Sequence, residues 1–191
     1  MPRRDDLESI MVLGSGPIKI GQAAEFDFSG SQAVRVLRED GYKVILVTSN
    51  PATIQNDPEM ADVVYIEPLL PDTIAKILEK ERPCALLAGM GGQTALNIAS
   101  ELSHNGTLER LNVELIGSDL DAIDKAEDRE LFNQVCESIN LPIRQAVACN
   151  SIDEVIAAAE LIGSWPILIR PAFTLGGLGG GTARDMGELV E

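Results

Sequence analysis

Short aliphatic runs alternate with segments of helical periodicity along most of this 191-residue chain. The runs are continuously apolar, which is typical of strands that are covered by helices on both faces of a sheet. They lie at residues 10–13, 43–47, 63–66, 85–88 and 114–116. Segments at 31–39, 74–81 and 94–102 carry aliphatic residues at helical spacing. This alternation predicts an α/β fold with a doubly wound, mostly parallel sheet.

A second unit is expected to begin at residue 128, so that the predicted domains are residues 1–127 and 128–191. The predicted elements of the second unit are helices at 130–139 and 152–161 and strands at 145–148 and 166–169. Ser151 is the expected N-cap of the later helix, because its hydroxyl can accept from the first free backbone N–H groups. So short a segment buries little apolar surface, and we therefore expect an incomplete domain.

Composition excludes several classes of protein. The chain has 30 acidic residues against 15 Lys and Arg, a net charge of -15, which repels nucleic acid phosphates. No apolar run approaches the roughly 18 residues that a membrane span needs. The three cysteines are widely spaced and the single histidine, His104, has no partner ligands nearby in sequence, which argues against a disulfide framework or a metal site. Unpaired thiols are typical of a cytoplasmic protein.

The glycine pattern after the first strand does not fit a dinucleotide site. Gly14 and Gly16 are followed by Gly21, so the spacing differs from G-x-G-x-x-G, and no Gly-Lys-Ser/Thr follows as in a Walker A loop. The second strand leads into residues 48–51, which lack the acid that would bind a ribose hydroxyl. A nicotinamide-dependent oxidoreductase is therefore disfavoured, and these glycines are interpreted as serving a tight turn and close helix packing.

The run from Gly176 to Gly181 favours a different chemistry. A glycine-rich loop exposes backbone N–H groups that can wrap an anionic phosphate tail, and it can close over a nucleotide. The strand before this run delivers Arg170, a permanent cation that can contact phosphate oxygens. Together, the arginine and the loop predict a phosphate-binding site.

Several longer strings resemble the large subunit of carbamoyl-phosphate synthetases along the whole chain. They are residues 14–27, 49–53, 57–62, 90–97, 124–129 and 169–171. That family's large subunit consists of two homologous halves, each a small Rossmann-like pre-ATP-grasp domain followed by an ATP-grasp domain. Residues 29–33 and 179–181 resemble the versions of the first half, so the chain is identified as the N-terminal, carboxyphosphate part, cut within its first ATP-grasp domain.

The resemblance implies a function and a set of site residues. The first half phosphorylates bicarbonate with ATP to give carboxyphosphate, which ammonia, either from glutamine or free, converts to carbamate on the way to carbamoyl phosphate for pyrimidine and arginine synthesis. Arg129 and Arg170 resemble the family's phosphate-contacting arginines, and Gly176 and Gly177 its nucleotide-loop glycines. The cofactors implied are ATP and Mg²⁺, with the metal ligands beyond Glu191, so this chain by itself is expected to be inactive.

The resemblance also implies partners, namely a glutamine amidotransferase small subunit and the remainder of the large subunit. The segment at 163–166 is one residue longer than the family's usual approach to its strand, which affects the expected position of Arg170. An alternative function is a non-catalytic α/β interaction module that keeps the pre-ATP-grasp fold without turnover.

Overall fold

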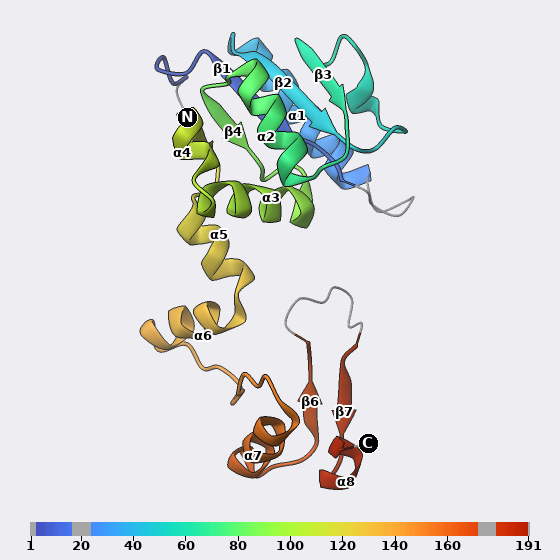
Figure 1. Ribbon diagram of the computed structural model, residues 1–191, viewed down its shortest axis with the longest axis vertical. Coiled ribbons are helices and arrows are strands. Elements are labelled where there is room, and N and C mark those ends of the chain that lie inside the picture. The colour runs from blue at the N-terminus through green and yellow to red at the C-terminus, as the bar shows by residue number, and fades with distance from the viewer. Residues whose placement is uncertain (1–2, 17–23, 172–178, 191) are drawn as a thin grey trace. The chain divides into compact units, whose positions relative to one another are not determined.

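The chain divides into two compact units, residues 1–124 and 125–191, and each is described here by itself. The computed structural model describes residues 3–16, 24–171 and 179–190 (Figure 1). Within these ranges, each helix is too short or too polar to cross a lipid bilayer. The three cysteines, Cys84, Cys136 and Cys149, are free thiols.

A five-stranded parallel sheet forms the centre of the first unit. Its strands are β1 (Ser9–Leu13), β2 (Lys43–Thr48), β3 (Val63–Ile66), β4 (Ala85–Leu87) and β5 (Glu114–Ile116). They lie in the order β3-β2-β1-β4-β5, with every neighbouring pair parallel. The predicted α/β class is confirmed, and the reversal of strand order at β1 is that of a doubly wound sheet.

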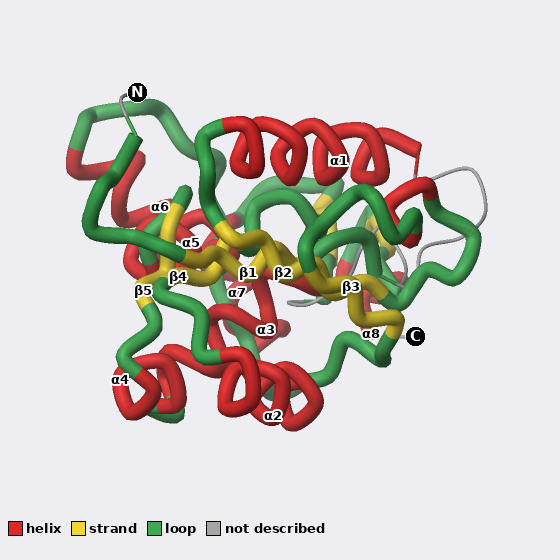
Figure 2. Tube along the Cα trace, turned by 90° about the horizontal axis from the view of Figure 1, so that it is seen from above, coloured by secondary structure: helices red, strands yellow, loops and turns green. Residues whose placement is uncertain are grey.

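Helices cover both faces of this sheet (Figure 2). On one face lies α1 (Ala24–Glu39), whose Val34 packs with Ile10 and Val12 of β1. On the other lie α2 (Pro71–Glu81), α3 (Gly92–His104) and α4 (Thr107–Leu111), which pack against a core that includes Met11 and Leu13. Successive β1 residues therefore enter opposite cores, which explains why the strand is apolar at every position.

The helix boundaries follow local chemistry that periodicity alone does not reveal. The helix expected at 31–39 begins earlier, at Ala24, with Glu25 and Asp27 in its first turn, where negative charge is favourable. Helix α2 has Pro71 at its start and ends before Arg82, which adopts the left-handed conformation. The short 3-10 helix η1 (Ile54–Asn56), α4 and α5 (Leu120–Glu127) were not predicted, because they are too short to show a clear apolar period.

The second unit follows the boundary within α5 and contains α6 (Arg129–Ser138), α7 (Ile152–Ile162), β6 (Ile167–Ile169), β7 (Gly181–Ala183) and α8 (Met186–Val190). Strands β6 and β7 form an antiparallel pair. The Ser151 hydroxyl accepts from the backbone N–H of Glu154, so the predicted N-cap is confirmed. Asp128 caps α6 by accepting from the N–H groups of Glu130 and Leu131.

The prediction of a strand at residues 145–148 is wrong. Residues 141–149 have no regular secondary structure and are almost entirely exposed. The described strands of this unit pair only with each other, so neither provides a hydrogen-bonding partner for residues 141–149. The aliphatic residues Ala146, Val147 and Ala148 cannot form a strand without a partner for their backbone groups.

Glu81, the last residue of α2, connects this helix to the edge strand β3. Its carboxylate accepts from the Tyr65 hydroxyl at 2.7 Å and lies 3.3 Å from the Lys43 ammonium, with only 13% of its side chain exposed. The Tyr65 hydrogen bond and then the Lys43 contacts lower the pKa of Glu81 below its usual 4.5. The pKa of Glu81 is lower in the folded state than in the unfolded state. The stabilisation is therefore fully present at pH values above the unfolded-state pKa, and it is lost as the pH falls through the folded-state pKa.

Glu81→Gln is therefore expected to lower the free energy of unfolding by about 1 kcal/mol near neutral pH. The difference from the parent chain should shrink as the pH falls through the depressed folded-state pKa of Glu81, because the carboxyl is then protonated in both states. Urea titrations at neutral pH and in acid below that pKa measure it, with Glu109→Gln on exposed α4 as control. A deficit of the same size at both pH values would contradict this electrostatic account.

Candidate functional site

The start of α6 and the end of β6 meet at Arg129. Its Nη1 donates to the carbonyl oxygen of Pro171 at 2.9 Å, across 42 positions of the sequence. Arg170 is the residue that follows β6 and directly precedes Pro171. The second unit thus brings the backbone next to Arg170 into contact with the guanidinium of Arg129.

Both arginines keep donor groups exposed to solvent. Among the described residues, neither makes an ion pair with a carboxylate within 4.0 Å, although acidic residues are abundant. A guanidinium is charged at every physiological pH and offers several N–H donors in a planar fork, a geometry that matches phosphate and carboxylate oxygens. This end of β6 is therefore suited to an anion.

The glycine run after β6 is described only from residue 179 onward, and Gly176 and Gly177 lie outside the described residues. Gly179 has φ +71°, and a Cβ there would lie 3.3 Å from Cγ of Pro171. A side chain at this position would be both strained and crowded, which explains the glycine at the entry to β7.

Polar loops also meet at the carboxyl end of the first unit's sheet, where the doubly wound fold predicts ligands. The Ser15 hydroxyl donates to Asp27 Oδ1 at 2.7 Å, and the Thr48 hydroxyl donates to the Ser15 carbonyl at 2.9 Å. The Thr48 oxygen in turn accepts from the backbone N–H of Asn50 at 3.2 Å. These bonds tie the loop after β1 to the loop after β2. Gly21 and the other residues from 17 to 23 lie outside the described residues.

Gln55 is a buried polar residue of this region that sequence reasoning missed. Its side chain is fully buried, and its Nε2 donates to the carbonyls of Phe26 and Asp27 at 3.1 and 3.3 Å. A Cβ at Gly30 would lie 2.5 Å from that nitrogen, and one at Gly14 would overlap Oε1. These glycines therefore leave room for an amide that holds η1 against α1, in addition to permitting the turn. The only sequence feature that could have revealed it is the pair of glycines itself.

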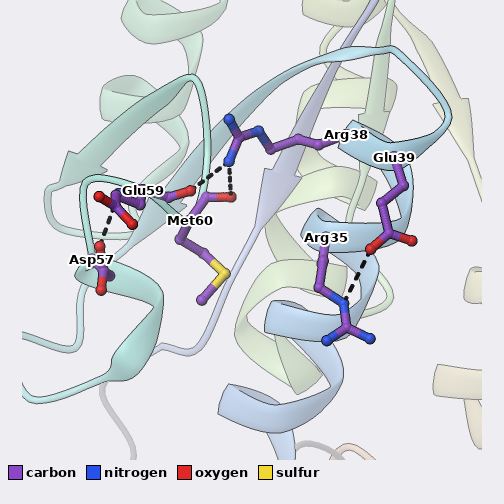
Figure 3. A pocket seen from close by; sticks show the side chains of 6 residues that line it. All are labelled: Arg35, Arg38, Glu39, Asp57, Glu59 and Met60. Atoms are coloured by element: carbon purple, nitrogen blue, oxygen red, sulfur yellow. Dashed lines mark hydrogen bonds and ion pairs between the residues drawn. The ribbon is translucent and has the colours of Figure 1, made fainter.

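A surface groove of about 470 Å³ lies at the opposite, amino end of the same sheet (Figure 3). It is lined by the last turns of α1 and by the segment between η1 and β3, with residues Arg35, Arg38, Glu39, Asp57, Glu59 and Met60. The Arg38 guanidinium donates to the carbonyls of Glu59 and Met60, and Arg35 lies 3.5 Å from Glu39. The lining carries both signs of charge, and both arginines are already engaged, so the groove does not select a class of ligand.

The described residues offer no group of three or more His, Cys, Asp or Glu side chains that could hold a metal ion. They therefore do not fit a Mg²⁺ site by themselves, and the chemistry assigned to them below is that of cations and backbone groups.

Comparison with known families divides the chain close to the boundary between its two units. Residues 6–125 match the carbamoyl phosphate synthase preATP-grasp domain, and residues 128–191 match the carbamoyl-phosphate synthase L chain, ATP binding domain. The first match covers more than half of the chain. The second assigns α6, α7, β6, β7 and α8 to an ATP-binding family.

Curated relatives agree along the full length. The carbamoyl phosphate synthase large chain of a Nostoc species is 57% identical over 191 residues, which are 100% of this chain and 17% of that protein. The protein of the same name from Neisseria meningitidis serogroup A is 58% identical, again over 100% of this chain and 18% of the relative. The chain thus spans less than a fifth of the length of the curated relatives that it matches.

Among solved structures, the biotin carboxylase domain of Hydrogenobacter thermophilus 2-oxoglutarate carboxylase has a TM-score of 0.70 at 19% identity. The likeness covers 96% of this chain and 39% of that one, and it supports the fold. Because both family matches and the relatives bear the same name, the expected resemblance is confirmed, and the chain belongs to the family of the carbamoyl phosphate synthase large chain.

Proposed function

We propose that this chain is the part of a carbamoyl phosphate synthase large chain that helps to form carboxyphosphate from bicarbonate and ATP. Residues 1–127 would be its pre-ATP-grasp domain and residues 128–191 the beginning of its ATP-grasp domain. The observation that carries the site is the hydrogen bond from Arg129 to the Pro171 carbonyl, because it brings Arg129 to the residue that follows Arg170 at the end of β6. The match of residues 128–191 to an ATP-binding family supports ATP as the phosphoryl donor.

In the proposed reaction, a bicarbonate oxygen forms a bond to the γ-phosphorus of ATP while the bond to the ADP oxygen breaks. Ammonia then attacks the carbonyl carbon of carboxyphosphate, phosphate departs, and loss of a proton leaves carbamate. Negative charge on the transferring phosphoryl oxygens is the quantity that a catalyst must stabilise in the first step. Arg170 and the remaining N–H groups of Arg129 would supply that stabilisation.

The metal that accompanies ATP would supply further charge neutralisation when bound. The described residues do not form a carboxylate set for it, and the family resemblance implies ligands outside this segment. Exclusion of water is the other requirement, because carboxyphosphate hydrolyses readily. Gly176 and Gly177 are proposed to serve this purpose by lining the nucleotide.

We further propose that ammonia comes from a glutamine amidotransferase small subunit and that the reaction takes place in the cytoplasm. The free thiols support that compartment. A non-catalytic interaction module is not favoured, since the similarity extends through the ATP-binding match.

The function is tested by bicarbonate-dependent ATP hydrolysis in the complete large chain without ammonia. Arg129→Ala should reduce that rate by about tenfold to a hundredfold, because one cationic donor to the phosphoryl group is lost. Arg129→Lys keeps the charge but not the fork, so it should recover only part of the rate.

The matched control is Arg144→Ala, which removes an exposed arginine of the same unit from an irregular segment. ADP release is followed with and without added bicarbonate for each variant. If the parent chain showed no stimulation by bicarbonate, the proposed reaction would be refuted. Stimulation that survives Arg129→Ala unchanged would instead refute only the role of this arginine.

A further inference from the structure

Three side chains of the first unit form a closed triangle between α3 and α5. The Ser100 hydroxyl donates to Asp124 Oδ1 at 3.0 Å. The Ser100 Oγ also lies 3.2 Å from His104 Nδ1. His104 Nε2 lies 3.1 Å from Asp124 Oδ2. Ser100 and His104 are one turn apart on α3, whereas Asp124 belongs to α5. Every member therefore contacts both others.

The donors and acceptors of this triangle can be counted. An ionised carboxylate only accepts, so Ser100 uses its single hydrogen on Asp124 and can only accept from His104. For the same reason, Nε2 must carry a hydrogen to bond Asp124 Oδ2. All three contacts are thus hydrogen bonds only when both ring nitrogens are protonated. In the neutral ring one contact places two lone pairs face to face, and one bond of the triangle is lost.

The helices near His104 carry further charged groups. His104 itself is the last residue of α3. On the neighbouring α2 and α4, Arg110 of α4 pairs with Glu79 of α2 at 2.9 Å. On α5, Asp121 and Lys125 flank Asp124 and have interactions of their own. Among the described residues, the ion pair of His104 is the one with Asp124.

The trio has the composition of a hydrolase triad, but its connections differ. In such a triad the hydroxyl gives its hydrogen to the imidazole, and the carboxylate contacts only the other ring nitrogen. Here the hydroxyl gives its hydrogen to the carboxylate, so the serine oxygen is not activated as a nucleophile.

We propose that Ser100, His104 and Asp124 form a proton-operated latch that holds α5 on α3. Proton binding to His104 completes the triangle, and proton loss opens one of its bonds. The chain passes through α5 into the second unit, so the latch acts on the helix that connects the two units. This role is independent of the proposed phosphoryl-transfer site.

Because His104 is the single histidine of the chain, nuclear magnetic resonance can observe the latch directly. Near pH 6, both ring nitrogens of His104 should carry hydrogen and couple to it. Amide hydrogen exchange in α5, corrected for intrinsic rates, should be about twofold to fivefold slower near pH 6 than near pH 8, the factor expected of an exposed ion pair.

Two substitutions separate the latch from a general effect of pH. His104→Gln should abolish the difference in α5 exchange between the two pH values. His104→Arg carries a permanent cation, so it should give slow exchange at both. The proposal would be overturned if His104→Gln kept the pH response, if His104→Arg exchanged as fast as His104→Gln, or if Nδ1 carried no hydrogen near pH 6. Amides of α2, remote from the latch in sequence, serve as the internal reference.

Discussion

Arg170→Ala in the complete large chain is expected to reduce bicarbonate-dependent ATP hydrolysis by about a hundredfold or more, a loss typical of removing a preorganised transition-state donor. Arg170 follows β6, and the next residue, Pro171, is held by the hydrogen bond from Arg129. Its guanidinium is exposed and makes no ion pair among the described residues, so it is available to an anion. Charge that develops on the phosphoryl oxygens would lose this partner in the variant.

The measurement is ADP release with saturating bicarbonate and no ammonia, with kcat and the KM for ATP determined separately. A loss confined to kcat is expected if the arginine acts in the transition state, whereas a rise in KM alone would indicate ground-state binding. Arg184→Ala is the control, because that side chain is 82% exposed and pairs only weakly with Glu188 at 3.4 Å. Unchanged hydrolysis in Arg170→Ala would exclude this residue from the site.

Gly91→Ala is expected to lower the free energy of unfolding by about 3 kcal/mol or more, at the upper end of overpacking effects. A Cβ at this position would lie 2.7 Å from the Leu13 carbonyl oxygen, 2.6 Å from Ala95 Cβ, and closer still to the Gly14 carbonyl oxygen. Two of these neighbours are backbone atoms at the end of the central strand β1. They cannot rotate away as a flexible side chain would, so the start of α3 must move off the sheet.

Two other glycines of the same region provide a graded comparison. A Cβ at Gly89 would meet nothing within 4 Å, and one at Gly16 would lie 3.2 Å from Thr94 Cβ. Urea unfolding should therefore rank the alanine variants with Gly89 nearly neutral, Gly16 intermediate and Gly91 most destabilised. A Gly91→Ala chain as stable as Gly89→Ala would show that the close approach between α3 and β1 does not limit stability.

The central sheet was predictable because its strands are apolar runs that can be recognised in the sequence alone. Ile10 and Met11 are adjacent, yet both are almost completely buried, since the two faces of the sheet are covered by different helices. A continuous aliphatic run reports such two-sided burial directly. In the described part of the second unit, the buried apolar residues are Cys136, Ala158, Ala159 and Ala183. There the strand predicted at 145–148 was wrong, because a strand depends on a partner that sequence does not specify.

The two arginines of the candidate site were predicted on different grounds. Arg170 followed from a strand and a glycine run, whereas Arg129 came only from the family resemblance, because a charged residue at a helix start is ordinarily a solvated one. What the sequence could not reveal is that Arg129 donates to the Pro171 carbonyl. A contact across 42 positions depends on where the chain turns between them.

By itself, then, the sequence determined the α/β class, the strand positions of the first unit and the family, because local periodicity and extended strings of residues carry that information. Only the tertiary structure decided that Gln55 fills the space left by Gly14 and Gly30, and that Ser100 and His104 meet Asp124. Each of these depends on atoms from separate elements approaching within hydrogen-bond or van der Waals distance. Their positions follow from packing of the whole unit, and no local pattern encodes them.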